Sequence, residues 1–530
     1  MSATNFVNNK KWDAIIIGTG FGGSMAAYQL TRAGLKVLLL ERGNWVARDD
    51  SAWDPKSILI QRIHKSPSHF ESPTWAGRGD VYPDSAVGGN SIFYGAASLR
   101  LRENDFRAAS TFKDLGPTSL SHVDWPLSYA ELEPDYEEAE RLLHVSGDAE
   151  RDPCAPPRNA PYPQRPEPYS IPAERLVRAG EKLDLRPFPL PLAINYDSSK
   201  EQPACRKCQT CDLFPCKICA KNDLTVRILP DILKNGGTIR PATIAKKLIK
   251  QGNRITGVEC VDATTGETFK LSCSLCIVSS GAIGSTQLLL LSGLSHSKWN
   301  GNLVGRYLLR HCNGIVIGMF PFQTNPDQEF NKQVAFTDFY YGNPGGSGLP
   351  GPWGMLQALQ VPPAEYIQSQ APFPIGNIGA ATTKYHSYLL CIAEDLPNKD
   401  NRIELHPGRK DKFGIPIPNI LSVYDKRDIL ARRALYREAA RILKTAGATI
   451  RLQKPINTWS HAIGGCRFGS SPENAVLDPN CTFFGIPNLF VVDGSFMPTS
   501  GGVNPSLTIA ANALRVGRYI AKNSERILRD

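Results

Sequence analysis

Residues 13–23 read Asp13-Ala-Ile-Ile-Ile-Gly18-Thr-Gly20-Phe-Gly22-Gly23, a short apolar run that leads directly into a glycine-rich turn. Residues 24–33 then show helical periodicity and are followed by Gly34. A second apolar run, Lys36-Val-Leu-Leu-Leu40, ends on Glu41. Strand, tight turn, helix and strand in this order predict the first βαβ unit of a dinucleotide-binding fold.

Each glycine of this turn has its own physical role. Gly18 permits the tight turn, Gly20 lets backbone N–H groups approach a pyrophosphate, and Gly23 lets the helix pack closely on the strand. The positive end of the helix favours the phosphate charge. Glu41 is placed to accept hydrogen bonds from both ribose hydroxyls of an adenosine and would repel a 2′-phosphate, which disfavours NADP. The alternative is a glycine-rich turn that only packs.

The length and composition are those of an ordinary soluble protein. A chain of 530 residues exceeds the usual size of one hydrophobic core, so two closely joined domains are expected. No apolar run reaches the roughly 18 residues that would span a bilayer, so no transmembrane segment is expected. The net charge of +10 comes from scattered Lys and Arg, which argues against nucleic acid as a partner. The first ten residues lack the pattern of a signal peptide, and a cytoplasmic location is expected.

The middle of the chain predicts a second kind of strand pattern. Three strand-like runs, 243–250, 255–263 and 267–280, are separated by short turns and indicate an antiparallel meander that rejoins the main sheet. Residues 321–385 are rich in Gly, Pro and aromatic residues, and we interpret them as a substrate-facing portion with loops. Near the C-terminus, residues 488–492 predict another strand.

A helix is predicted from the segment that begins Asn504-Pro505. Asn504 suits the N-cap position, Pro505 suits the first helical position, and the helical pattern runs to about Lys522. Both ends of the chain are therefore expected to build one domain, with the other domain inserted between them.

We therefore expect an α/β fold, with a Rossmann-like dinucleotide-binding domain and an inserted α+β domain that contains a mostly antiparallel sheet. The first domain is expected to comprise residues 1–155, 220–312 and 456–530. The inserted substrate-binding domain and its loops are expected to comprise residues 156–219 and 313–455.

Five blocks of the sequence resemble, in order, those of the glucose–methanol–choline (GMC) oxidoreductase family. The blocks are Gly18 to Gly23 with Glu41; Val87-Gly88-Gly89-Asn90-Ser91; Trp125-Pro-Leu-Ser-Tyr129; Gly281-Ala282-Ile-Gly-Ser285; and His461-Ala-Ile-Gly-Gly-Cys466 with Asp493-Gly494 and Asn504-Pro505. The resemblance implies that FAD binds in an extended form to the Rossmann-like domain. It also implies that the sheet of the second domain roofs the isoalloxazine ring.

The resemblance carries a set of FAD-binding residues onto this sequence. The implied contacts are Gly18, Gly20, Phe21, Gly22, Gly23, Glu41, Arg42, Val87, Gly88, Gly89, Asn90, Ser91, Ala282, Asp493, Gly494, Asn504, Pro505 and Ser506. Family members with covalent flavin attach it through a His a few residues after the Gly-Gly pair. Here Gly88-Gly89 is followed by Asn90-Ser-Ile-Phe-Tyr94, without a His, so FAD is expected to be held non-covalently.

The resemblance also implies the chemistry, which is oxidation of a CH–OH group of a small-molecule alcohol with hydride passing to flavin N5. His461 is similar to the family's base beside N5, and Asn504 is similar to its hydrogen-bonding partner. The helix from Pro505 would direct its positive end at the N1–C2=O region of the flavin. His311 is interpreted as structural. Two alternatives stay open, namely an FAD-containing lyase of the same fold, like hydroxynitrile lyases, and a flavin electron-transfer protein.

Five of the thirteen cysteines crowd into one segment with the spacing C-x2-C-x2-C-x4-C-x2-C. The five are Cys205, Cys208, Cys211, Cys216 and Cys219. This density suits an iron–sulfur cluster or a tetrahedral zinc ion, and metal-free thiols are the third alternative. With a cluster, electrons would leave the flavin through it to an electron-acceptor protein, and the enzyme would be a dehydrogenase and not an oxidase.

Overall fold

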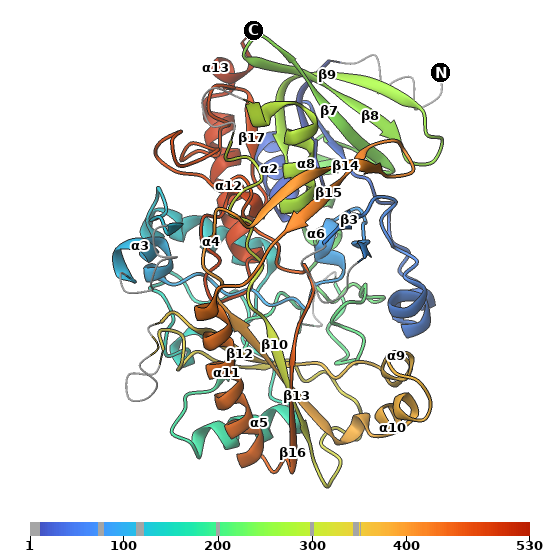
Figure 1. The fold of residues 1–530 in the computed structure, drawn as a ribbon, viewed down its shortest axis with the longest axis vertical. Coiled ribbons are helices and arrows are strands. Elements are labelled where there is room, and N and C mark those ends of the chain that lie inside the picture. The colour runs from blue at the N-terminus through green and yellow to red at the C-terminus, as the bar shows by residue number, and fades with distance from the viewer. Residues whose placement is uncertain are drawn as a thin grey trace.

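The computed structural model shows two main parts stacked along the long axis of the molecule (Figure 1). The upper part holds a seven-stranded sheet, and the lower part holds a six-stranded sheet. A smaller four-stranded sheet, in which β14 (Arg402–Lys410) and β15 (Pro416–Leu421) are the longer strands, packs against helix α8 (Gly281–Leu291). The structure describes residues 11–72, 79–112, 121–197, 202–296, 302–342, 349 and 351–529.

The predicted βαβ unit is confirmed at the centre of the seven-stranded sheet. Strand β1 (Lys11–Ile17) leads through the glycine turn into helix α2 (Phe21–Arg32), which returns to strand β2 (Val37–Leu40). The two strands are parallel, with Ile17 opposite Leu40. Apolar β-branched runs of this kind suit a parallel sheet that is buried on both faces.

The antiparallel meander is also confirmed, and it returns to the same sheet as predicted. Its last strand lies parallel to β1, with Val278 opposite Ile17, and the C-terminal strand β17 pairs with it on the other side. Segments from both ends of the chain therefore share one sheet. The bounds are β6 Thr238–Arg240, β7 Thr243–Gln251, β8 Arg254–Asp262, β9 Thr268–Val278 and β17 Leu489–Val491.

The six-stranded sheet of the lower part is antiparallel at every pairing, in the order β16-β10-β13-β12-β11-β5. This confirms the expected fold class. Two of its strands, β11 and β12, come from the glycine- and proline-rich stretch 321–385. The bounds are β5 Phe188–Pro189, β10 Gly314–Met319, β11 Val334–Phe336, β12 Gly354–Leu359, β13 His386–Ala393 and β16 Ile450–Pro455.

The two faces of this sheet have different neighbours. Leu356 and Leu389 lie on the face that packs against helix α11 (Lys426–Thr445), together with α5 (Ile171–Glu181). On the opposite face, Ala335, Met355, Leu390 and Ile392 belong to the same buried cluster as the core of the upper part. Side chains alternate along a strand, so these residues lie on the face opposite to Leu356 and Leu389. Their shared cluster with the upper core shows that this face is turned toward the nucleotide-binding fold.

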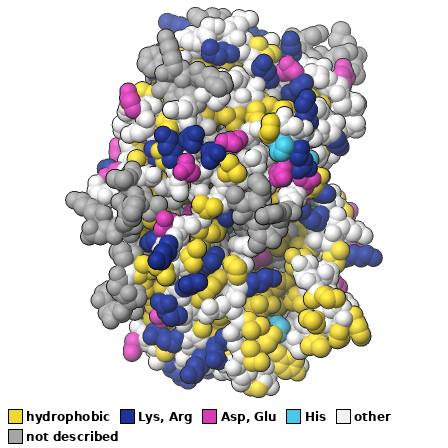
Figure 2. All heavy atoms as spheres, viewed as in Figure 1, with side chains coloured by type: hydrophobic (Ala, Val, Ile, Leu, Met, Phe, Trp, Pro, Cys, Tyr) yellow, Lys and Arg dark blue, Asp and Glu magenta, His cyan; other side chains and the backbone are white. Residues whose placement is uncertain are grey.

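A short helical pair, α9 (Ala364–Ser369) and α10 (Ile375–Ala381), extends from the lower part. Phe373 between the two helices is 83% exposed, and hydrophobic side chains gather on the surface where Figure 1 places this pair (Figure 2). None of the helices in the described ranges combines the length and the apolar character that a bilayer crossing requires.

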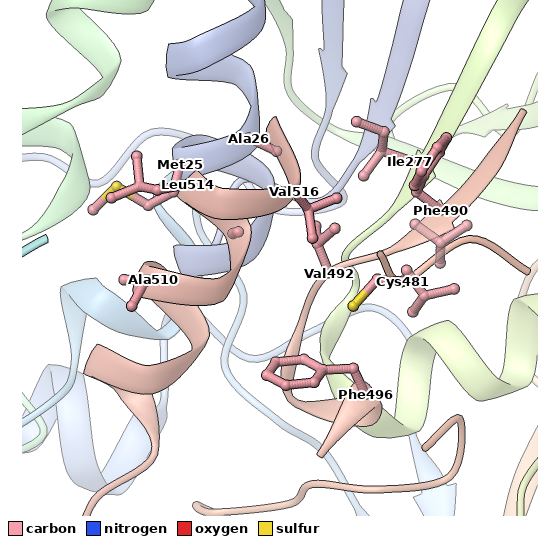
Figure 3. Packing of buried hydrophobic residues seen from close by; sticks show 14 of the residues in the cluster. Met25, Ala26, Ile277, Cys481, Phe490, Val492, Phe496, Ala510, Leu514 and Val516 are labelled. Atoms are coloured by element: carbon pink, nitrogen blue, oxygen red, sulfur yellow. The ribbon is translucent and has the colours of Figure 1, made fainter. Parts of the chain in front are cut away.

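Helix α12 (Ser506–Lys522) packs against α2 in the core of the upper part, where Figure 3 shows Leu514 beside Met25. Small residues allow this close approach, since a Cβ atom on Gly517 would lie 3.2 Å from the Cα atom of Ala26. The prediction that Asn504 is the N-cap is wrong. The helix begins at Ser506 with Pro505 at the cap position, and the Asn504 amide is turned toward His461.

A buried ion cluster ties the segment after the Gly88-Gly89 loop to helix α4 (Tyr129–Leu143). Arg100 is 1% exposed and makes two hydrogen bonds to the Glu140 carboxylate, at 2.9 and 2.8 Å. A third bond of 2.9 Å joins Arg100 to Glu133. Such bidentate pairs hold a fixed geometry, so the cluster anchors the segment that leads from the loop.

Candidate active site

The glycine turn after β1 forms a shallow cradle. A Cβ atom on Gly18 would lie 2.1 Å from the backbone oxygen of Ser279, and one on Gly23 would lie 2.0 Å from that of Gly18, so both positions require glycine. A Cβ atom on Gly20 would meet no described atom within 4 Å. Gly20 also occupies the N-cap of α2 without a side-chain hydrogen bond. Free backbone N–H groups beside open space suit a phosphate.

The Gly88-Gly89 loop lies directly on this turn. The Gly88 N–H donates to the Thr19 hydroxyl at 2.9 Å, and a Cβ atom on Gly89 would lie 2.7 Å from the Gly20 Cα atom. Ser91 closes the loop by donating to the Gly88 carbonyl. The structure thus brings together two segments that the sequence predicted as cofactor-binding. In the same region the Phe21 ring contacts the Tyr94 ring, with centroids 5.4 Å apart.

Glu41 directly follows β2 at the rim of the cradle. Its carboxylate accepts hydrogen bonds from the backbone N–H and the hydroxyl of Thr19, at 3.1 and 2.7 Å, and from the Gly43 N–H at 3.0 Å. These donors fix the orientation of the carboxylate at the carboxyl end of the strand, where nucleotides bind in this class of fold. Arg42 follows it and is partly buried.

Asp493 organises the other side of the site with its side chain. Its carboxylate accepts from the Gly281 N–H at 2.9 Å, at the start of α8 beside Ala282, and from the hydroxyl and N–H groups of Ser495, at 2.6 and 2.9 Å. Gly494 is thereby held near α8, while the Ser506 hydroxyl, at the start of α12, donates to the Ala97 carbonyl at 3.3 Å. The Asp493 carboxylate is therefore used within the protein, and a cofactor contact through the backbone of Asp493-Gly494 stays a prediction.

Two histidines and an asparagine meet where the two parts of the molecule join. The Nδ1 atoms of His461 and His311 lie 3.0 Å apart, and the rings are nearly perpendicular. On the other side of its ring, His461 Nε2 lies 3.4 Å from the Asn504 side-chain nitrogen. The predicted pairing of His461 with Asn504 is therefore present. His311 is the residue that sequence reasoning missed, because its isolated Arg-His-Cys context carries no signal of a partner 150 positions away.

The surroundings of His311 determine which nitrogen of His461 can act as a base. His311 Nε2 lies 3.1 and 2.9 Å from the carbonyl oxygens of Ser500 and Gly501, so this nitrogen carries the proton and donates it. The His311 Nδ1 atom is then an acceptor, and His461 Nδ1 must donate to it. His461 Nε2 is left with its lone pair, next to the Asn504 amide.

Burial and the neighbouring groups His311 and Lys332 keep this histidine neutral. Removal from water lowers the pKa of His461 well below its usual value of 6.5, and His311 and the Lys332 ammonium lower it further. Lys332 is buried and pairs with Asp212 at 2.8 Å, and both charged groups lie against Gly95, at the end of the segment that follows the Gly-Gly loop. Neither Lys332 nor Asp212 was predicted as a site residue.

The neighbouring charges predict opposite shifts of the acid limb of activity in two variants. A base with a lowered pKa stays neutral as pH falls below 6.5 and is lost only at lower pH. Lys332→Gln removes a positive charge, so the pKa of His461 rises and the acid limb of flavin reduction moves to higher pH. Asp212→Asn leaves the ammonium uncompensated and moves the limb to lower pH. Reduction rates measured from pH 4 to pH 8 check both signs, and shifts in the same direction would contradict the arrangement.

The cysteine-rich segment lies beside the site but forms no recognisable metal centre. Four of its cysteines line one small cavity with Lys221 and Phe330, namely Cys205, Cys208, Cys211 and Cys216, and Cys219 follows. Burial raises the pKa of the Cys205 thiol to about 11. Across the described ranges, no group of three or more His, Cys, Asp or Glu side chains is arranged to hold a metal ion. Ligation by these cysteines stays a prediction.

Comparison with protein families matches most of the chain. Models of the GMC oxidoreductase family match residues 84–313 and 397–513, and a model of the NAD(P)-binding Rossmann-like domain matches residues 16–49. The matched ranges contain the Gly-Gly loop, α8, His461 and Asn504. The family assignment therefore rests on the same segments that build the site.

Individual relatives agree over nearly the whole length. The 6'''-hydroxyparomomycin C oxidase of Streptomyces lividus is 31% identical over 97% of this chain and 92% of its own length. The 2-methyl-1,2-propanediol dehydrogenase of Mycolicibacterium austroafricanum is 27% identical over 97% of this chain and 96% of its own. Among solved structures, pyridoxine 4-oxidase from Mesorbium loti shares the fold, with a TM-score of 0.67 and 18% identity over 96% of this chain and 99% of that one. This chain belongs to the GMC oxidoreductase family.

Proposed function

We propose that this protein oxidises the CH–OH group of a small-molecule alcohol with FAD as its cofactor. The observation that carries the proposal is the hydrogen-bonded chain from the Ser500 and Gly501 carbonyls through His311 to His461, which leaves the His461 Nε2 lone pair beside the Asn504 amide. The names of the relatives, an oxidase of a hydroxylated compound and a dehydrogenase of a diol, support the same reaction class.

The described residues fit FAD. The open side of Gly20 and the uncapped start of α2 suit a pyrophosphate, and Glu41 suits the adenosine ribose. The start of α12 also lacks a side-chain cap, so its N–H groups and positive end suit the negative charge that a reduced flavin carries. Asn504 has a buried side-chain oxygen without a partner in the described parts of the chain, which is what a site for a polar ligand group requires.

The proposed mechanism follows from the donors and acceptors in place. His461 Nε2 accepts the hydroxyl proton of the alcohol, while the Asn504 amide donates an N–H to the same oxygen. Loss of that proton places electron density on the oxygen, and this density forms the C=O bond as the hydride leaves the carbon. FAD, when bound, supplies the two-electron acceptor for that hydride. His311 holds His461 in the tautomer that accepts at Nε2.

Anaerobic mixing with alcohols tests the proposal. Bleaching of the flavin absorbance by an alcohol supports oxidation, whereas a lyase or an electron-transfer protein of the same fold would leave the flavin oxidised. Admission of oxygen then shows whether the protein behaves as an oxidase or as a dehydrogenase. Rapid recovery of the absorbance with release of hydrogen peroxide identifies an oxidase, and slow recovery identifies a dehydrogenase that needs another acceptor.

Non-covalent attachment of FAD gives a direct prediction. No histidine follows Gly88-Gly89 within the loop, so the side chain through which covalent family members attach flavin is absent there. Acid precipitation is expected to release all flavin into the supernatant, measured by absorbance and by mass, and yellow colour retained in the pellet would contradict this.

Iron, sulfide and zinc measured on the same anaerobically purified sample test the metal alternatives for Cys205 to Cys219.

A further inference from the structure

Gln357, at the centre of strand β12, is a buried side chain without a partner. It is 0% exposed, and neither its amide oxygen nor its amide nitrogen has a hydrogen-bond partner in the described parts of the chain. Buried amides are nearly always hydrogen-bonded, because leaving one unpaired costs stability. A polar group of this kind that the protein itself does not satisfy points to a ligand.

The position of Gln357 in the sheet directs it toward the active site. It lies opposite Ala335 on one neighbouring strand and opposite Leu390 on the other, so it shares their face, which is turned toward the nucleotide-binding fold. The alternate residues, Leu356 and Ala358, lie in the cluster that packs against α11.

The two ends of β12 lie beside opposite edges of the catalytic group. At its start, a Cβ atom on Gly502 would lie 2.5 Å from the Gly354 Cα atom, and Gly502 is two residues before Asn504. Just past its end, the Gln360 side chain accepts a hydrogen bond of 3.0 Å from the Asn331 N–H, next to Lys332. Gln357 lies midway along the strand between these two points, on the face that is turned toward the nucleotide-binding fold.

The Lys332–Asp212 pair offers further unused hydrogen-bonding capacity at the same edge. The Asp212 Oδ2 atom is buried and has no partner among the described residues. Lys332 carries three N–H donors, and the one hydrogen bond that it makes within the described ranges is to Asp212 Oδ1. An acceptor and two donors therefore remain beside the histidine pair.

A simple alcohol cannot satisfy these groups. Its single hydroxyl is used by His461 and Asn504, and a hydrocarbon body placed against Gln357 and Asp212 would leave a buried amide and a buried carboxylate oxygen unpaired. The geometry points to a polyhydroxylated, sugar-like alcohol, bearing hydroxyl or amino groups, whose further polar groups bind Gln357 and the Asp212–Lys332 pair. This inference rests on the proposed alcohol oxidation and names its substrate class.

A second buried glutamine shows what a purely structural role looks like in this fold. Gln333, next to Lys332, is 5% exposed, and its amide is used on both sides. Its nitrogen donates to the Pro168 carbonyl at 3.0 Å, and its oxygen accepts from the Ser170 N–H at 2.9 Å. Gln333→Met is therefore a matched control for Gln357→Met, with the same change of side chain in a neighbouring strand region.

The test compares alcohols that share a ring and a primary hydroxyl. Anaerobic flavin reduction is measured with methyl glucoside, methyl glucosaminide and cyclohexylmethanol, of which the last lacks every other polar group. Wild-type protein is expected to prefer at least one sugar over cyclohexylmethanol by about tenfold or more in reduction rate at low substrate concentration, because a site built for hydroxyl groups rejects an analogue without them.

The variants separate substrate binding from stability. Gln357→Met is expected to raise the apparent KM for the preferred sugar by about tenfold, to leave cyclohexylmethanol unchanged, and to keep or raise the melting temperature, since it removes an unpaired buried amide. Gln333→Met is expected to lower the melting temperature without changing the ratio between the two alcohols.

Three outcomes would overturn the inference. Preference for cyclohexylmethanol over both sugars contradicts the substrate class while leaving alcohol oxidation intact. An equal effect of Gln357→Met on both kinds of alcohol, with a loss of melting temperature like that of Gln333→Met, makes Gln357 structural. Flavin that no alcohol of either kind bleaches removes the proposed function itself, and the substrate class with it.

Discussion

His461→Ala is expected to slow anaerobic flavin reduction by an alcohol by about 10²- to 10⁴-fold, the usual cost of removing a positioned general base. The Nε2 atom of this residue is the acceptor that the His311 hydrogen bond leaves available. FAD content is expected to stay near that of the wild-type protein, because the cradle around Gly20 and the loop at Gly88-Gly89 do not involve the His461 side chain. Stopped-flow absorbance, with flavin occupancy measured in the same sample, gives both quantities.

A histidine outside the site provides the control. His406 is partly exposed, and its ring accepts hydrogen bonds from the N–H groups of Gly408 and Arg409, at 3.1 and 2.9 Å. His406→Ala is expected to reduce its flavin at the wild-type rate. If fully loaded His461→Ala also reduces at that rate with a true substrate, the base lies elsewhere.

Arg100→Met is expected to lower the free energy of unfolding by about 3–5 kcal/mol, because it leaves the buried Glu133 carboxylate without a cation and leaves Glu140 with Arg158 as its remaining cation. A loss of this size is a large share of the stability of an ordinary protein. The melting temperature and the midpoint of urea unfolding measure it. The segment after the Gly-Gly loop would also lose its anchor to α4, so FAD is expected to dissociate more readily from this variant.

An exposed ion pair gives the matched comparison. Arg178 and Glu174 are paired on helix α5 with side chains 70% and 49% exposed, so Arg178→Met is expected to cost less than about 0.5 kcal/mol. Glu133→Gln added to Arg100→Met is expected to recover part of the loss, since it removes the unpaired charge, whereas Glu140 keeps its pairing with Arg158. If Arg100→Met and Arg178→Met unfold at the same urea concentration, the buried cluster does not stabilise the protein.

The sequence predicted the parts of the site that depend on local patterns. The glycine turn, the βαβ unit and the meander each require a periodicity or a small residue within a few positions, and Gly18 and Gly23 have the roles expected of them. The pairing of His461 with Asn504 followed from a family resemblance. The predicted N-cap was wrong because the sequence Asn-Pro indicates a helix start without showing what the Asn side chain binds. In the structure the Asn504 amide is turned toward the His461 ring and does not cap the helix.

The remainder of the site depends on contacts between distant segments. His311 meets His461 across 150 positions, and Lys332 meets Asp212 across 120. Neither pair has a spacing that a helix or a strand would impose. Each of these residue types, taken alone, is more often an ordinary surface or core residue than part of an active site. Gln357 gave no signal for the same reason, since one polar residue in an apolar strand is recognisable as unpaired only when its neighbours on both sides are known.

Helices α2 and α12 pack in one core, and this affects the folding of the nascent chain. The ribosome adds about 5–20 residues per second, so roughly half a minute or more separates the emergence of α2 from that of α12. Until then the surface of Ala26 that packs against Gly517 remains exposed to solvent, and helix α2, which follows the nucleotide cradle, lacks its packing partner α12. We therefore expect the nucleotide cradle to reach its final packing only after α12 has joined α2.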